Sequence, residues 1–446
     1  MIAIVGGGIA GLAAARRLQS HGHEVQVFEA SPEVGGLAAV YETAGDRIEK
    51  FYHHLSASEG TIVDLIEELG LDDDLRWPIG KNAYYVDGVV HPLDTAWDIA
   101  AYPHMSLYDK FRLGMLTLEV DVRGGLPDFD TYDDLAAFEH VPIKEFLYEH
   151  TTRGVYENFF EPLLEAKFGD RKEDVSAAWL LGRIKFRGER DLLRGEPLGY
   201  LEGGFGRLLD ALVEDVGEEN ITTSARVTEL VGSDGIESVR VETDDGETEH
   251  DADGVVVAAM PNVLEELTGY ECDIDFQGTV CSVVSMDRSL TDTYWLNIAE
   301  DAPFGALIEH TNFISEDHYG GEHLLYVPRY IQSPDEEVWG MSDEEVEDLW
   351  LEGIEDLFPE FEREHVNWIK TARNPRTAPV YERGYLDMVV PYDLSEAGHE
   401  DVYYAGMASM AQYPERSLNG GIEAGYSCAD LIAGLEPDYG PDVGGE

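Results

Sequence analysis

Three glycines near the amino terminus have the spacing of a phosphate-binding turn. Gly6, Gly8 and Gly11 form the pattern G-x-G-x-x-G. In such a turn the first glycine permits a tight bend, the second lets a pyrophosphate approach the backbone, and the third lets a helix pack closely on a strand. Glu29 lies 18 residues beyond Gly11, near the separation at which a carboxylate holds a ribose diol. These residues predict that the stretch binds a dinucleotide.

The elements around these glycines are the ones that a dinucleotide-binding turn requires. Residues 2–5 are an apolar run typical of a buried parallel strand, residues 12–18 favour a helix, and residues 23–29 alternate as a second strand. The phosphates would rest on the helix N-terminus, where free N–H groups and the helix dipole favour negative charge. The residues of this unit predicted to contact the dinucleotide are Gly6, Gly8, Ile9, Ala10, Gly11, Glu29 and Ala30.

The residues after Glu29 bear on which dinucleotide binds. Ala30 and Ser31 offer no cation for a 2′-phosphate, which disfavours NADP and leaves NAD and FAD open. The following segment, SPEVGGLAAV, carries the adjacent glycines Gly35 and Gly36. It resembles the double-glycine segment of the flavin-dependent amine oxidase, protoporphyrinogen oxidase and phytoene desaturase superfamily. That resemblance implies FAD, with Gly35, Gly36 and Leu37 along its pyrophosphate.

Later segments resemble the same superfamily. It implies that the backbone of Val227 holds the adenine, and that the helix beginning near residues 419–422 aims its N-terminus at the N1–C2=O edge of the flavin. Two departures stand out. Val34 and Leu37 replace the basic residues that commonly flank the double glycine, and Met407 replaces a common acidic residue. The further cofactor contacts that the resemblance implies are Val227, Gly406, Met407, Asn419, Gly420, Gly421 and Ile422.

The resemblance implies an α/β fold, in which a Rossmann-like FAD-binding domain (GR2-type flavoprotein) carries an inserted α+β substrate domain. Asp87-Gly88 predicts a hairpin turn, and Ser342 with Glu345 predicts a capping box that opens a helix. Residues 95–193 are predicted to be mainly helical, and strands are predicted from residue 276 onward. The predicted boundaries are 1–50, 200–268 and 388–435 for the FAD-binding domain, 51–199 and 269–387 for the substrate domain, and 436–446 for a flexible tail.

Two adjacent histidines, His53 and His54, are the first candidates for catalysis. In an extended chain their side chains point to opposite sides, which disfavours a shared metal, and no metal site is predicted. One interpretation is packing at the domain junction. The other is that one imidazole faces the flavin or substrate, where it could shuttle a proton. The stretch resembles the His-containing segment beside the flavin in UDP-galactopyranose mutases, which favours one histidine without saying which.

Arginines and tyrosines in the later strands are secondary candidates. Arg329 and Tyr330, with Arg376, Tyr381 and Tyr385, lie in segments predicted to return toward the flavin. An Arg beside a Tyr suits an anionic or carbonyl-bearing substrate. Ordinary strand packing explains these residues equally well.

The composition limits the partners. The 446 residues include 91 acidic and 30 basic side chains, which give a formal net charge of −61, spread along the whole chain. Such a surface repels nucleic acid and anionic membranes and resembles the surfaces of proteins from extreme halophiles. No apolar run approaches a membrane span, and no leader segment is expected before the first strand. The expected location is cytoplasmic, with a monomer or a homodimer.

The leading functional prediction is an FAD-dependent oxidoreductase that takes a hydride from a small-molecule substrate to flavin N5. The substrate and the electron acceptor stay open. Simple amine oxidation is not favoured, because no lysine stands in a clear motif. One alternative is a flavin-dependent isomerase of nucleotide-sugars, like UDP-galactopyranose mutase. The other is a non-catalytic flavin-binding escort protein.

Overall fold

A computed structural model describes residues 1–118, 132–186, 194–233 and 235–437. One of its sheets has five parallel strands, which come from stretches far apart in the sequence that fall within the three ranges predicted for the FAD-binding domain. The predicted tail lies mostly outside the described residues. In sheet order the strands are β10 (Ile221–Thr222), β2 (Val25–Phe28), β1 (Ile2–Val5), β14 (Gly254–Val257) and β20 (Val402–Tyr404).

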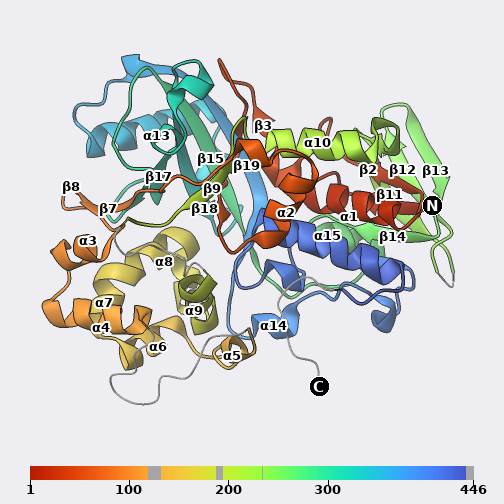
Figure 1. The fold of residues 1–446 in the computed structure, drawn as a ribbon, viewed down its shortest axis with the longest axis horizontal. Helices are drawn as coiled ribbons and strands as arrows, with labels where there is room; N and C mark the ends of the chain where they lie inside the picture. The colour runs from red at the N-terminus through yellow and green to blue at the C-terminus, as the bar shows by residue number, and fades with distance from the viewer. Residues whose placement is uncertain (119–131, 187–193, 234, 438–446) are drawn as a thin grey trace.

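Helices α1 (Ile9–Ser20), α10 (Gly206–Val216) and α15 (Leu418–Ile432) pack around this sheet (Figure 1). Helices α1 and α15 lie close together. A side chain at Gly425 would collide with the carbonyl oxygen of Ala10. A Cβ atom at Gly421 would lie 3.0 Å from the side chain of Ile9. The small residues of α15 therefore set how closely the first and last helices of the chain approach.

A second, antiparallel sheet lies beside the five-stranded sheet, at the right-hand edge of Figure 1. It consists of β11 (Arg226–Val231), β12 (Ser238–Thr243) and β13 (Gly246–Asp251). The turn before β11 is bonded to the end of β2, because the N–H of Ala225 donates to the carbonyl of Glu29 and the N–H of Ser224 donates to that of Ser31. This connection places the start of β11 beside Glu29.

The other large sheet is mixed and has seven strands. Helix α13 (Asp343–Leu357) covers one face, where Val346, Trp350 and Ile354 pack on strand residues, and the other face packs into a cluster that includes residues of α1 and α10. Both local predictions are confirmed: Ser342 and Glu345 form the capping box of α13, and Asp87-Gly88 turns the hairpin between β7 and β8. The strands, in order, are β19 (Val366–Pro379), β15 (Phe276–Met286), β18 (His323–Ile331), β17 (Ala306–Glu309), β16 (Trp295–Ile298), β7 (Asn82–Val86) and β8 (Val89–Pro92).

A group of helices lies below this sheet in Figure 1, and the described part of residues 95–193 is mainly helical, as predicted. Residues 119–131 and 187–193 of that range lie outside the description. The helices are α3 (Ala96–Ala101), α4 (Leu107–Thr117), α5 (Tyr132–Ala136), α6 (Ile143–His150), α7 (Arg153–Val155), α8 (Glu161–Phe168) and α9 (Ala177–Phe186).

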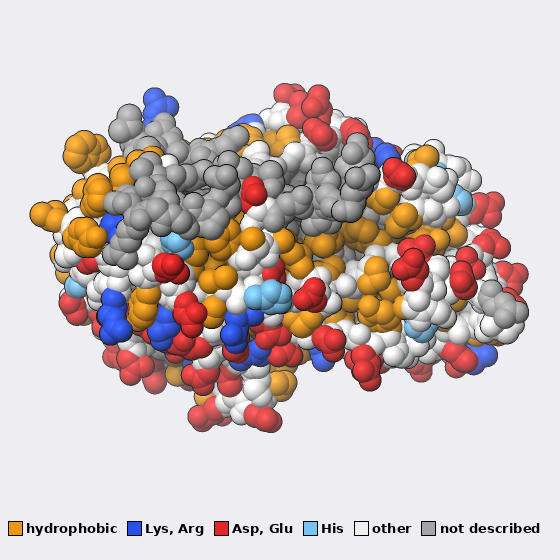
Figure 2. All heavy atoms as spheres, turned by 90° about the horizontal axis from the view of Figure 1, so that it is seen from below, with side chains coloured by type: hydrophobic (Ala, Val, Ile, Leu, Met, Phe, Trp, Pro, Cys, Tyr) orange, Lys and Arg blue, Asp and Glu red, His pale blue; other side chains and the backbone are white. Residues whose placement is uncertain are grey.

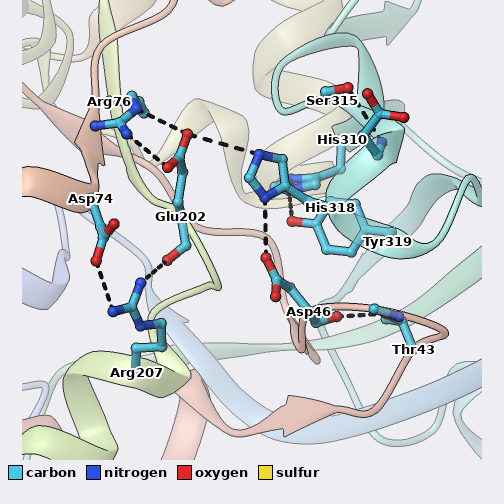
Figure 3. A network of polar contacts seen from close by, with 12 residues as sticks. Thr43, Asp46, Asp74, Arg76, Glu202, Arg207, His310, Ser315, His318 and Tyr319 are labelled. Atoms are coloured by element: carbon cyan, nitrogen blue, oxygen red, sulfur yellow. Dashed lines mark hydrogen bonds and ion pairs between the residues drawn. The ribbon is translucent and has the colours of Figure 1, made fainter.

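A polar network joins the loop after β3 (Val40–Tyr41) to the seven-stranded sheet's connections (Figure 3). The imidazole of His318 lies between the carboxylates of Asp46 and Glu202, at 3.2 and 3.8 Å, and Arg76 donates to Glu202 from 2.9 Å. Gly45 lies so close to the carbonyl of His318 that a Cβ atom there would collide with it. These contacts fix the chain between the double glycine and the two histidines.

Acidic side chains are scattered over the face shown in Figure 2 rather than gathered in one place. Within the described residues, no helix combines the length and the apolar character needed to cross a membrane.

Candidate active site

The glycine-rich turn has one open position. Gly6 adopts φ +109°, and a Cβ atom there would lie 2.5 Å from the carbonyl oxygen of Ala258. A side chain at Gly11 would collide with the carbonyl of Gly6, so strand and helix pack closely here. Gly8, the N-cap of α1, has nothing within 4 Å of the position of a Cβ atom, and no side chain caps the helix. Space and free N–H groups therefore coincide at this helix N-terminus.

The double glycine lies directly against this turn. The N–H of Gly35 donates to the carbonyl of Gly7 at 2.9 Å, and Gly8 and Gly35 form a parallel bridge. Gly36 adopts φ +55°, and a Cβ atom there would lie 3.6 Å from the Cα atom of Gly8. Two backbone segments without side chains thus border the same space, as a pyrophosphate requires.

Glu29 stands at the end of β2 with its carboxylate already oriented. Its Oε2 accepts a hydrogen bond from the N–H of Gly7 and its Oε1 accepts one from the N–H of Ser31, both at 2.7 Å. The side chain is buried, whereas Ala30 is exposed, and the buried Val227 is the second residue of the neighbouring strand β11. A fixed acceptor beside the glycine turn fits the ribose diol of a dinucleotide.

The turn around Gly8 and the double glycine Gly35–Gly36 together form a glycine cradle, and the C-terminal segment completes its border. Gly406 ends the connection from β20 and allows no side chain, because a Cβ atom would overlap the carbonyl of Ala259; the partly buried Met407 follows it. Helix α15 begins at Leu418, one residue before the predicted start. Its residues Gly420, Gly421 and Ile422 are buried, and the side chain of Asn419 accepts a hydrogen bond from the N–H of Ile62 at 2.8 Å.

A pocket adjoins the double glycine. It is a small, partly open pocket, and Leu37, the residue after Gly36, belongs to its lining. The residues that line it are Leu37, Phe51, Tyr52, His53, Thr279, Thr377 and Arg416. The glycine cradle and the pocket are therefore continuous along the chain.

His53 and His54 have different surroundings. His53 lines the pocket, and its Nδ1 lies 2.6 Å from the carbonyl oxygen of Phe51. Burial lowers the pKa of His53 to about 4, and the positive charge of Arg416 acts in the same direction. His54 instead places its Nδ1 3.1 Å from the hydroxyl of Tyr294 and packs against the ring of Trp295. The structure thus brings His53, and not His54, into the lining of the pocket.

The floor of the pocket comes from the seven-stranded sheet. Thr279 of β15 and Thr377 of β19 place their hydroxyl oxygens 2.5 Å apart, at a point where the pairing of the two strands shifts register. Such a bulge re-aims side chains locally. Tyr330 is paired with Thr279 across β18, and its hydroxyl lies 2.9 Å from that of Tyr52.

Strand alternation sends Arg329 to the other face of the same sheet. It is paired with Val280, which packs under α13, and its guanidinium lies 3.2 Å from both Glu336 and the carbonyl of Pro303. Among the described residues that line the pocket, Arg329 and Arg376 do not occur.

The remaining two secondary candidates are buried in the core. The hydroxyl of Tyr381 donates to the carbonyl of Gln412 at 2.8 Å, and the ring of Tyr385 packs against that of Tyr381. Neither belongs to the described lining of the pocket.

Phe51, Tyr52, Thr279, Thr377 and Arg416 line the pocket and were not predicted as site residues, and Arg416 is the charged one among them. It lies in the loop before α15, and the available signal was a cation four residues before the pair Gly420-Gly421 in a chain with few cations. Its Nε atom is buried and has no hydrogen-bond partner, and one terminal nitrogen lies 3.5 Å from the hydroxyl of Tyr330. The pocket therefore contains a cation whose hydrogen-bonding capacity is largely unused.

Comparisons with known proteins supply the family. The profile of the flavin containing amine oxidoreductase family matches residues 9–433. Mitochondrial protoporphyrinogen oxidase from Nicotiana tabacum is 24% identical over 261 residues, which cover 51% of this chain and 50% of that protein. A solved structure assigned as a protoporphyrinogen oxidase from Exiguobacterium sp. 255-15 has a TM-score of 0.75 and 20% identity, over 97% of this chain and 98% of that one. A reduced UDP-galactopyranose mutase has a TM-score of 0.70 and 16% identity, over 97% and 95%.

These similarities differ in what they establish. The chain spans about half the length of the first curated relatives that it matches. The solved structures share the fold, which confirms the predicted α/β flavoprotein architecture. The family match, together with the glycine cradle, confirms the prediction of FAD. The chain belongs to the flavin containing amine oxidoreductase family.

Proposed function

We propose that this protein is an FAD-dependent oxidoreductase that removes a hydride from a small-molecule substrate held in the pocket beside Leu37. The observation that supports the proposal is that the pocket lining includes Leu37, directly after Gly35–Gly36, so that a substrate in the pocket would lie beside a bound dinucleotide. Bound FAD would supply the hydride-accepting chemistry at its N5 atom. The backbone around Gly8 and the carboxylate of Glu29 would hold the cofactor.

The pocket residues would bind and orient the substrate. A carbonyl oxygen only accepts hydrogen bonds, so Nδ1–H of His53 donates to Phe51 and its Nε2 keeps a lone pair. With a pKa of about 4, His53 is too weak a base to store a proton near neutral pH. Its proposed role is to accept a hydrogen bond from an N–H or O–H group of the substrate, while Phe51 and Tyr52 exclude water.

The isomerase alternative uses the same cradle but a different electron balance. In an oxidoreductase each substrate molecule reduces one oxidised flavin. An isomerase starts with reduced flavin, and the oxidation state of the flavin is the same after turnover. The similarity to a reduced UDP-galactopyranose mutase keeps this alternative open at the level of the fold.

The deciding experiment is an anaerobic substrate screen with oxidised and with dithionite-reduced protein. The proposal predicts that a substrate bleaches the oxidised flavin in a single turnover and that oxygen or an artificial acceptor restores it. If only the reduced form turned over a substrate, the protein would be an isomerase and not an oxidoreductase. Tight flavin without turnover in either state would favour the non-catalytic escort.

A further inference from the structure

We infer that Arg416 is the anion-recognition residue of this pocket, and that the substrate carries a carboxylate or phosphate group next to an apolar or aromatic body. The inference rests on the proposed function for the reaction, but it concerns which molecules the pocket selects. It starts from the surroundings of one guanidinium in a chain with 91 acidic residues.

Within the described part of the chain, Arg416 forms no ion pair or hydrogen bond with a carboxylate, and the charge of Glu415 acts on it only from a longer distance. Its Nε is buried without a hydrogen bond, and its contact with Tyr330 at 3.5 Å is a long one between a cation and a neutral hydroxyl. Arg329 and Arg363, by contrast, both form ion pairs with glutamates. A partly buried cation without a direct counter-ion contact is costly, and an anionic ligand would offset that cost.

The neighbouring carboxylate is already occupied. Glu415 accepts from Lys167 at 2.8 and 3.0 Å, from the indole N–H of Trp179 at 3.1 Å, and from Arg183. Lys167 and Arg183 thus share one carboxylate, and Arg416 adds a third cation beside it. The pKa of Lys167 is lowered to about 7, chiefly by burial, with Arg183 and Arg416 adding to the effect. Lys167, Arg183 and Arg416 thus lie near a single carboxylate, which makes this region more basic than the strongly acidic molecule as a whole.

Arg416 is the charged residue of the described pocket lining, and it is therefore the residue that would bind an anion. The other described lining residues are neutral near pH 7: the apolar Leu37 and Phe51, the phenol of Tyr52, the imidazole of His53 and the two threonines Thr279 and Thr377. Thus the described lining contains no carboxylate to compete for the guanidinium. A guanidinium in such surroundings binds carboxylate or phosphate oxygens with charge-assisted hydrogen bonds.

The test uses flavin-loaded protein at one fixed KCl concentration and three probes of similar shape: benzoate, phenyl phosphate and neutral benzamide. Binding is followed by the change in flavin absorbance and by calorimetry. The variants are Arg416→Met, Arg416→Lys and, as a control outside the pocket, Arg329→Met. We expect wild type and R329M to bind one of the two anions at least about tenfold more tightly than benzamide. R416M loses that preference and R416K retains part of it.

Several results would overturn the inference. One is an anion preference that persists in R416M, and another is a wild-type protein without any preference. A third combines two observations: wild type shows no anion preference, and R416M loses FAD or has a shifted flavin midpoint potential. Arg416 would then serve the cofactor and not the substrate. If the protein binds no flavin, the proposed function fails, yet calorimetry of the same variants still decides whether Arg416 binds anions.

Discussion

The Nδ1 atom of His53 lies 2.6 Å from the carbonyl oxygen of Phe51, two residues earlier in the chain. This short local contact fixes the tautomer of the imidazole, because only a protonated Nδ1 can donate to a carbonyl. The ring is neutral as well, since burial and the charge of Arg416 both oppose a second proton. His53 therefore presents a hydrogen-bond acceptor, and this has a measurable consequence for stability.

Replacing His53 by Asn should reduce the loss of stability on acidification. The pKa of His53 is about 4 in the folded protein and near 6.5 in an unfolded chain, so its contribution is full above about pH 6.5 and decreases as the pH falls toward 4. Between about pH 7 and pH 5, wild type should lose about 1–2 kcal/mol more unfolding free energy than H53N. Urea unfolding at both pH values measures this, with the exposed His140→Asn as the control. Equal losses in wild type and H53N would contradict the assigned protonation state.

Replacing Lys167 by Met should remove a pH dependence of the unfolding free energy that lies above pH 7, on the alkaline side of the one expected for His53. The folded protein releases this proton near pH 7, whereas the unfolded chain holds it to about pH 10.4, so the contribution of Lys167 to stability rises with pH between these values. The difference in unfolding free energy between wild type and K167M should grow by about 1 kcal/mol per pH unit above pH 7. The exposed Lys81→Met serves as the control, and its difference from wild type should stay constant. A constant difference for K167M would show that Lys167 stays protonated.

Replacing Gly425 by Ala should separate helices α1 and α15. The added methyl group would collide with the backbone carbonyl of Ala10, which cannot rotate away, so we expect a loss of about 1–3 kcal/mol of unfolding free energy. Gly114, inside α4, has nothing within 4 Å of its Cβ position, and G114A should instead gain about 0.5–1 kcal/mol. Thermal and urea unfolding of the two variants make the comparison. A G425A variant as stable as G114A would refute the close helix contact.

Replacing Gly8 by Ala should weaken FAD binding without weakening the fold. The methyl group would enter the open space at the N-terminus of α1, where no protein atom lies within 4 Å. We expect the dissociation constant of FAD to rise at least about tenfold, or about 1.4 kcal/mol, while the flavin-free protein unfolds as wild type does. Flavin fluorescence during reconstitution measures the affinity, and G114A should bind like wild type. Unchanged affinity in G8A would place the pyrophosphate elsewhere.

The parts of the fold that follow from the sequence are local. Gly6, Gly11 and Glu29 lie in one contiguous strand–turn–helix–strand unit, so their spacing alone predicts their arrangement. The Asp87-Gly88 hairpin and the Ser342–Glu345 capping box are equally local, and both are present as expected. In each case the residues that interact lie within a few positions of one another or in consecutive elements.

The pocket is not local, and its composition was largely beyond the sequence. Thr279 and Thr377 are nearly one hundred positions apart and meet only because β15 and β19 pair with a register shift. Arg329 and Tyr330 are neighbours in the chain, yet strand alternation sends them to opposite faces. Arg416 forms no ion pair with its neighbour Glu415, which instead pairs with Lys167 and Arg183 from two distant helices. Such competition for one carboxylate has no signature in the sequence.

The most direct test of the account is the absorbance spectrum of protein purified in multimolar KCl, before and after anaerobic dithionite. The account predicts flavin bands at one flavin per chain that bleach on reduction and return on exposure to air. A folded, colourless protein that cannot be reconstituted with FAD would contradict the cradle formed by Gly8, Gly35 and Glu29, and with it the proposed oxidoreductase.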